Sequence, residues 1–372
     1  MTKVISYKNP ELTTVKDNKA VWNLPKTRRY GYRNLHKINR YGLFLRSDLV
    51  LKLKKKYKDT IYKKPLVKKM TKHKSFCSLI VGNKQNIYFE KYAKDFTENQ
   101  PQTIMSITKM FVNLFVGELL NNKSINLDKK VSYYLPKIGS GYANAKIQDV
   151  LNMNIINAYT EDYKKAYSSS FLHEPVGGWR LPKNVDKHLS QELYLNTIKS
   201  KKNRNLKNKS NLAFYKSANT DVIGLIVEKI SGKPLRHWML RAVEAAGFEE
   251  GIYIASDRYG MPWMSGGGCL ITRDFLRMGL LFARKGKGVG NRRIGSASFL
   301  DQTVKNVGPK YMNLSENKYL YYSNSTMVSG NIIGHSGYGG QFLAVNLKTG
   351  NVAAFFSVLE TKSATKESYK VD

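Results

Sequence analysis

The pattern of apolar and polar positions predicts β-hairpins in two parts of the chain. Within residues 76–92, two apolar runs flank the polar stretch 82–86, which is typical of a hairpin. Residues 341–347 and 351–358 form a second pair of apolar runs around the turn Lys348-Thr349-Gly350. These hairpins predict antiparallel strands.

Between the hairpins, apolar residues recur at helical spacing in several stretches. The expected helices cover residues 106–121, 147–153, 221–230, 235–246 and the stretch FLRMGLLFARKG that ends at Gly286. We therefore expect an α/β protein in which a largely antiparallel sheet carries helices on both faces. A helical region is expected between about residues 105 and 240, with the functional site between it and the sheet.

The first 75 residues form the most basic part of the chain. They contain 22 lysines and arginines against 4 acidic residues. Apolar residues such as Trp22 and Leu45 still punctuate this stretch too often for a solvated tail. We expect residues 1–75 to be an extended segment that wraps the main domain, residues 76–372, and turns a basic face outward.

Composition narrows the class of protein. At 372 residues the chain can bury a large core. It has no apolar run long enough to cross a bilayer and no apolar stretch near its start that would indicate a secretory signal, so we expect a cytoplasmic protein. Two cysteines, Cys77 and Cys269, argue against a disulfide framework, and the six histidines show no metal-ligand spacing. We expect neither a metal nor an organic cofactor.

The formal net charge of +35 would attract nucleic acid, anionic membranes or acidic substrates. No RNA-binding or helix-turn-helix motif accompanies it. Because the lysine excess is spread along the chain, a general composition bias explains it without a binding role. A nucleic-acid partner is therefore not expected, although a basic binding protein stays an alternative, and the oligomeric state is left open.

The strongest candidate for chemistry is Ser106-Ile-Thr-Lys109, at the start of an apolar helix. One helical turn separates the two residues, so both side chains should lie on the same side. A helix N-terminus offers N–H groups and a positive dipole end to developing negative charge. In an apolar setting, Lys109 can lose its proton near neutral pH and act as a base. The same spacing recurs at Ser315 and Lys318, where no apolar helix follows.

Three other segments accompany this motif. Tyr215-Lys216-Ser217 precedes a predicted helix, Gly266–Gly268 permits a close backbone passage, and His335-Ser336-Gly337 enters a glycine-dense turn. The loop-rich stretch 154–200 contains aromatic residues, among them Tyr163, which would either line a substrate pocket or pack in the core.

With these segments in order, residues 75–360 resemble the serine β-lactamase-like superfamily, on its class C and esterase side. The likeness is greatest to carboxylesterase-like 6-aminohexanoate-dimer hydrolases, through residues 140–163 and 214–224. The resemblance implies a serine hydrolase that works through an acyl-enzyme. Ser106 would be the nucleophile, and Lys109 and Tyr215 would transfer protons.

The resemblance also implies a substrate site. The N–H groups of Ser106 and Tyr338 would form the oxyanion hole. The neighbouring substrate-binding positions are Tyr163, Ser217, His335 and Gly337.

Two positions depart from class C β-lactamases, which usually carry Asn in place of Ser217 and Lys in place of His335. Both departures favour small-molecule esters or linear amides as substrates over β-lactams. A β-lactamase or penicillin-binding activity and a non-catalytic binding relative remain the alternatives.

Overall fold

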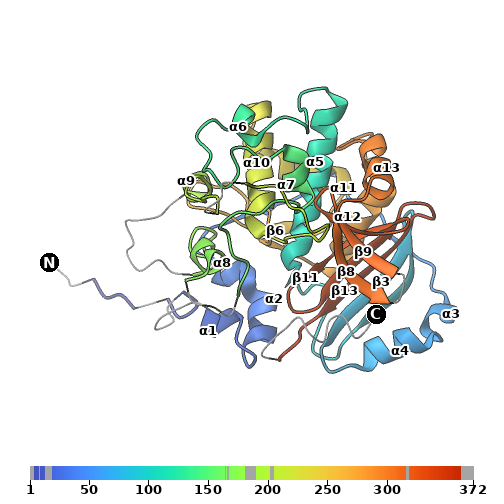
Figure 1. Ribbon diagram of the computed structural model, residues 1–372. Helices are drawn as coiled ribbons and strands as arrows, with labels where there is room; N and C mark the ends of the chain where they lie inside the picture. Colours follow the sequence, from blue (N-terminus) through green and yellow to red (C-terminus); the bar gives the residue numbers. More distant parts are fainter. Residues whose placement is uncertain are drawn as a thin grey trace.

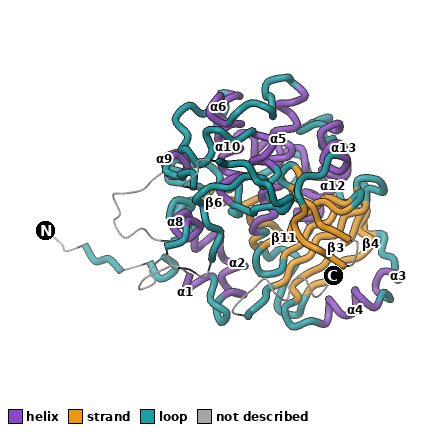
Figure 2. Tube along the Cα trace, viewed as in Figure 1, coloured by secondary structure: helices purple, strands orange, loops and turns teal. Residues whose placement is uncertain are grey.

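The computed structural model describes residues 4–7, 9–12, 19–163, 165, 167–180, 190–201, 205–315 and 318–361. Strands gather on one side of the molecule, and helices with long loops occupy the other (Figures 1 and 2). This is the mixed α/β architecture that the sequence predicted.

Within the described residues, the larger sheet has nine strands. All neighbouring strands run antiparallel except β2 and β4, which are parallel. Their order across the sheet is β2 (Lys54–Lys55), β4 (Asn86–Tyr92), β3 (Phe76–Asn83), β13 (Asn351–Ser357), β12 (Gln341–Asn346), β11 (Ile332–Gly337), β10 (Thr326–Ser329), β9 (Lys318–Ser323) and β8 (Lys310–Ser315).

Both predicted hairpins are confirmed. β3 and β4 pair as far as Asn83 and Asn86, so the turn is shorter than the polar stretch suggested. Between β12 and β13, the side-chain oxygen of Asn346 accepts hydrogen bonds from the N–H groups of Lys348 and Thr349, each at 3.0 Å. Gly350 then adopts a φ of 76°. Lys348-Thr349-Gly350 is therefore a hairpin turn. It follows Asn346, which pairs with Ile332 at the start of β11, so it lies at the opposite end of that strand from His335–Gly337.

A second, four-stranded sheet was not predicted. Its order is β1 (Gly42–Leu45), β6 (Ile252–Ala255), β7 (Gly268–Leu270) and β5 (Gln102–Thr103). All four strands have four residues or fewer, which is too short for a clear periodic pattern, and β5 has only two residues. This small sheet leads from β5 directly into the segment that carries Ser106.

The expected helices are present. The longer ones are α5 (Met110–Asn121), α10 (Ser217–Ser231), α11 (Leu235–Ala246), α12 (Thr272–Ala283) and α13 (Ala297–Lys305). The shorter ones in the helical part are α6 (Val131–Tyr134), α7 (Ile147–Leu151), α8 (Ser169–His173) and α9 (Gln191–Asn196).

Helix α10 begins at Ser217, four residues before the predicted start. The polar pair Asn219-Thr220 suggested a cap, but both residues are buried inside the helix. The side-chain oxygen of Asn219 accepts a hydrogen bond from the Tyr142 hydroxyl at 2.9 Å, which satisfies it in the core. The predicted end is confirmed, because Gly232 adopts a left-handed φ of 62°.

Helices cover both faces of the large sheet. On one face, α12 packs against β13 so closely that a Cβ on Gly279 would lie 2.3 Å from Val352. On the other face, Phe76, Leu79, Phe89 and Phe355 form an apolar cluster. The helices α3 (Asp59–Tyr62) and α4 (Pro65–Lys72) cover this cluster with Ile61, Val67 and Met70.

We expected the segment before residue 76 to be extended, but much of it is helical. It forms α1 (Lys19–Trp22) and α2 (Arg28–Ile38) as well as α3 and α4. In α2, Tyr32, Leu35 and Ile38 recur at helical spacing and are fully buried, which explains why the stretch is helical. Within the described residues, no helix combines the length and apolar character needed to span a membrane.

Candidate active site

Ser106 lies in a tight 3₁₀ turn, Met105–Lys109, that leads into α5. The sequence predicted one continuous α-helix here. Met105 has a positive φ of 48°, a strained conformation for a non-glycine residue. Strand β11 presses against this turn, since a Cβ on Gly337 would lie 2.5 Å from the carbonyl oxygen of Ile104. Only glycine therefore allows β11 to pass this close to the candidate nucleophile.

Lys109 is completely buried beneath Ser106. Its Nζ donates to Ser106 Oγ at 3.1 Å, to Ser217 Oγ at 3.3 Å and to the carbonyl oxygen of Ser265. Burial lowers the pKa of Lys109 to about 8, while the negative charges of Glu161 and Asp221 oppose that shift. About a tenth of Lys109 is therefore neutral at pH 7 and available to accept a proton, far more than for an ordinary lysine.

Glu161 is a member of the site that sequence reasoning did not single out. Its carboxylate accepts hydrogen bonds from the backbone N–H of Ser217 at 2.7 Å and from the Ser217 hydroxyl at 2.6 Å. The Tyr163 hydroxyl also donates to it. Because the Ser217 hydroxyl donates to Glu161, its oxygen lone pairs are left to face Lys109. The sequence offered one indication of this role, because Glu161 lies only two residues before the predicted site residue Tyr163.

Asp221 is a second acidic residue that was missed. It is fully buried on α10 and accepts a hydrogen bond from the N–H of Ser265 at 3.0 Å. The carbonyl of the same Ser265 holds Lys109. Burial raises the pKa of the Asp221 carboxyl well above its ordinary value. In the sequence, Asp221 resembled an ordinary acidic residue in the first turn of a helix.

Tyr215 lies beside Lys109, and His335 lies beside Tyr215. The Lys109 Nζ lies 5.0 Å from the centre of the Tyr215 ring, and the Tyr215 and His335 rings are 6.0 Å apart. Burial is the main cause that raises the pKa of Tyr215 well above its ordinary value, and neighbouring tyrosines add to it. The phenol therefore stays protonated.

His335 is fixed from both ends of its ring. Its Nδ1 donates to the Ser336 carbonyl oxygen at 2.7 Å, because that oxygen can only accept, and its Nε2 then accepts from the Tyr322 hydroxyl at 3.2 Å. Burial and the charge of Lys109 lower the pKa of His335 to about 3. The imidazole is therefore neutral at pH 7.

A pocket of about 510 Å³, measured out to its open mouth, lies over Ser106. Four of the residues predicted for the site line it: Ser106, Ser217, Tyr163 and Tyr338. Lys109, Tyr215, His335 and Gly337 surround these residues without lining the pocket. The rest of the wall is mixed. Its aromatic part comes from Trp22, Tyr159, Trp179 and Trp263, and its polar part includes Glu161 and Glu174.

No group of three histidine, cysteine, aspartate or glutamate side chains in the described part of the chain is arranged to hold a metal ion. Both cysteines, Cys77 and Cys269, are buried free thiols.

Comparisons with known proteins identify the family of the chain. A sequence model of the beta-lactamase family matches residues 77–370. The 6-aminohexanoate-dimer hydrolase of Paenarthrobacter ureafaciens is 28% identical over 224 residues, which make up 58% of this chain and 54% of that protein. The chain thus matches about half the length of this curated relative.

Solved structures share the fold. One from Bacillus anthracis, assigned as a 6-aminohexanoate-dimer hydrolase, has a TM-score of 0.73 at 19% identity and covers 92% of this chain and 91% of that chain. A D-stereospecific amidohydrolase from Streptomyces has a TM-score of 0.56 at 14% identity, with 79% and 92% covered. At these identities the likeness concerns the fold alone.

Proposed function

Since the chain belongs to the beta-lactamase family, we propose that it hydrolyses carboxylic esters or linear amides through an acyl-enzyme formed on Ser106. The observation that carries this proposal is the contact between Ser106 Oγ and the buried Nζ of Lys109 at 3.1 Å, at the base of an open pocket. A serine hydroxyl becomes a good nucleophile when a base with a lowered pKa lies within hydrogen-bond distance.

The reaction begins when Ser106 Oγ attacks the substrate carbonyl and its proton passes to neutral Lys109. The N–H groups of Ser106 and Tyr338 stabilise the negative charge that develops on the carbonyl oxygen. Tyr215 passes a proton to the leaving group and recovers one from Lys109, whose Nζ lies 5.0 Å from the centre of the Tyr215 ring. The bond to the leaving group breaks and the acyl-enzyme remains.

Water then attacks the acyl-enzyme and gives up its proton to the same unit. The bond between Ser106 and the acyl group breaks, the free acid leaves and the serine regains its proton. Glu161 and Asp221 touch Lys109 only through Ser217 and Ser265, so they act as positioning residues. No step needs a metal or an organic cofactor.

A fluorophosphonate probe should label the protein at Ser106 and nowhere else. The probe phosphonylates serines whose hydroxyl has been activated by a neighbouring base, and the contact with Lys109 singles out Ser106. Peptide mapping by mass spectrometry locates the label. Absence of labelling at Ser106 in folded protein would favour a non-catalytic relative that only binds its ligand.

Esters should be better substrates than β-lactams. A β-lactam carries a carboxylate that needs a fixed cationic donor, and His335 is neutral and already occupied by Ser336 and Tyr322. The measurement compares kcat/KM for p-nitrophenyl butyrate and nitrocefin. A tenfold advantage for nitrocefin, ~1.4 kcal/mol of transition-state preference, would overturn the substrate class and leave the serine mechanism standing.

A further inference from the structure

The wall of the pocket includes a residue from outside the region that matches the family. Trp22, on α1, lines the pocket together with Ser106, although the family match begins at residue 77. Its side chain is 1% exposed. Its indole N–H donates to the Trp179 carbonyl oxygen at 3.1 Å, and the two rings lie 4.9 Å apart. The segment before the family domain therefore contributes directly to the candidate site.

Trp22 belongs to a continuous aromatic wall. Trp179 contacts Trp263 with ring centres 4.4 Å apart, and Trp263 also lines the pocket. A Cβ on Gly177 would lie 2.0 Å from the Trp263 ring, so the backbone before Trp179 rests on that ring. Close packing of this kind holds the indole rings in fixed positions. A wall of fixed flat rings suits a flat apolar group of a substrate.

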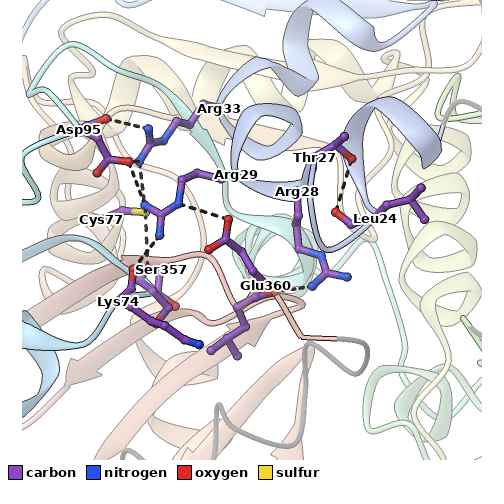
Figure 3. A network of polar contacts seen from close by, with 12 residues as sticks. Leu24, Thr27, Arg28, Arg29, Arg33, Lys74, Cys77, Asp95, Ser357 and Glu360 are labelled. Carbon is purple, nitrogen blue, oxygen red and sulfur yellow. Dashed lines mark hydrogen bonds and ion pairs between the residues drawn. The ribbon is translucent and has the colours of Figure 1, made fainter.

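Helix α2 holds Trp22 in place. A Cβ on Gly31 would lie 2.1 Å from the Trp22 Cα, so α1 rests directly on α2. Arginines anchor α2 in turn (Figure 3). Arg28, buried, donates to the carbonyl oxygens of Leu359 and Thr361 just beyond β13. Arg29 and Arg33 both bind the Asp95 carboxylate, at 3.1 and 3.0 Å.

The same helix reaches the proposed oxyanion hole. The Tyr32 hydroxyl, on α2, donates to the Tyr338 carbonyl oxygen at 3.1 Å. A Cβ on Gly339 would lie 2.4 Å from the Tyr32 ring, so the turn after β11 packs directly on this side chain. The α1–α2 segment is thus fixed to the reacting end of the pocket as well as to the end of the sheet.

From these contacts we propose that Trp22 determines specificity, and that it makes the pocket select substrates with an aromatic or similarly flat apolar group beside the scissile bond. The proposal rests on the proposed function, because it concerns the substrate of that reaction. It assigns the N-terminal segment a role in the site rather than in surface charge.

Three esters test the proposal in wild type and in Trp22→Ala: ethyl acetate, ethyl benzoate and benzyl acetate. The last two place the aromatic ring on the acyl side and on the alcohol side, respectively. For at least one of them, Trp22→Ala should lower kcat/KM about tenfold, mainly by raising KM, because the pocket loses part of its apolar wall. For ethyl acetate, which is too small to use the wall, the loss should be smaller, so the kcat/KM ratio of the aromatic ester to ethyl acetate should fall. Trp22→Phe should recover much of the loss.

Trp238→Phe provides a matched control. Trp238 is also a buried tryptophan, 4% exposed, but it packs on Phe115 and does not line the pocket. This variant should leave the ratios among the three esters unchanged. An equal loss for all three esters in Trp22→Ala, or no loss for any, would overturn the specificity role.

Binding separates this inference from the proposed function. In Ser106→Ala, calorimetric affinity for benzyl acetate or ethyl benzoate should fall about tenfold when Trp22→Ala is added. Absence of turnover in wild type would contradict the proposed hydrolysis. Unchanged affinity in the double variant would contradict the role of Trp22.

Discussion

Replacing Ser106 with alanine is expected to lower kcat for ester hydrolysis by on the order of 10³-fold or more, the loss typical of a removed serine nucleophile. Without Oγ no acyl-enzyme can form, and Lys109 has no hydroxyl to activate. The fold should persist, because Ser106 is partly exposed at the floor of the pocket. Hydrolysis of p-nitrophenyl butyrate provides the rate, and circular dichroism with the melting temperature monitors the fold.

The chain offers an internal control for this variant. Ser315, the last residue of β8, begins another Ser-x-x-Lys motif that leads into no apolar helix. Ser315→Ala should keep wild-type kcat and KM. Full activity in Ser106→Ala would overturn the mechanism, and a loss of similar size in both variants would point to general destabilisation.

Replacing Lys109 with alanine should lower kcat by ~10²-fold or more, as expected for lost general base catalysis. In wild type, kcat/KM should rise with pH and level off above about 8, because burial lowers the pKa of Lys109 to about 8 and only the neutral amine accepts a proton. The measurement is kcat/KM for p-nitrophenyl butyrate between pH 5 and pH 10, with subtraction of spontaneous hydrolysis.

Glu161→Gln tests whether Lys109 causes the rising limb of this pH profile. The Glu161 carboxylate raises the pKa of Lys109, and Asp221 acts in the same direction. Removal of the Glu161 charge should therefore lower the pKa of Lys109 and move the limb to lower pH. A wild-type profile that is flat from pH 6 to 10, or a shift to higher pH in Glu161→Gln, would show that another group titrates.

The sequence predicted well those elements that depend on neighbouring residues. Helix α11 has the expected limits, because its apolar spacing is regular and Gly247, with a φ of 68°, ends it. The hairpin of β12 and β13 likewise follows from a local turn. The Ser106 motif was visible because its two residues lie one helical turn apart.

The rest of the site depends on contacts that no local pattern reveals. Glu161 and Ser217 are hydrogen-bonded although 56 positions separate them in the sequence. Lys109 and Ser265 are hydrogen-bonded across a separation of 156 positions. Trp22 meets Trp179 across 157 positions. Each of these side chains has an ordinary local setting, so only the folded chain shows what it contacts. The same reason applies to β5, whose two residues become a strand only through pairing with β7.

The place of β3 in the sheet has a consequence for biosynthesis. β3 pairs on one side with β4, the next strand in the sequence, and on the other side with β13. The side-chain hydrogen bond between Asn83 and Asn351 joins residues 268 positions apart. Closing a loop of that length costs about 5 kcal/mol of chain entropy. While the ribosome is still making the intervening residues, the apolar edge around Leu79 and Ile80 has no strand to cover it. Until β13 emerges, the nascent chain therefore carries an open apolar strand edge, and such an edge pairs readily with other chains.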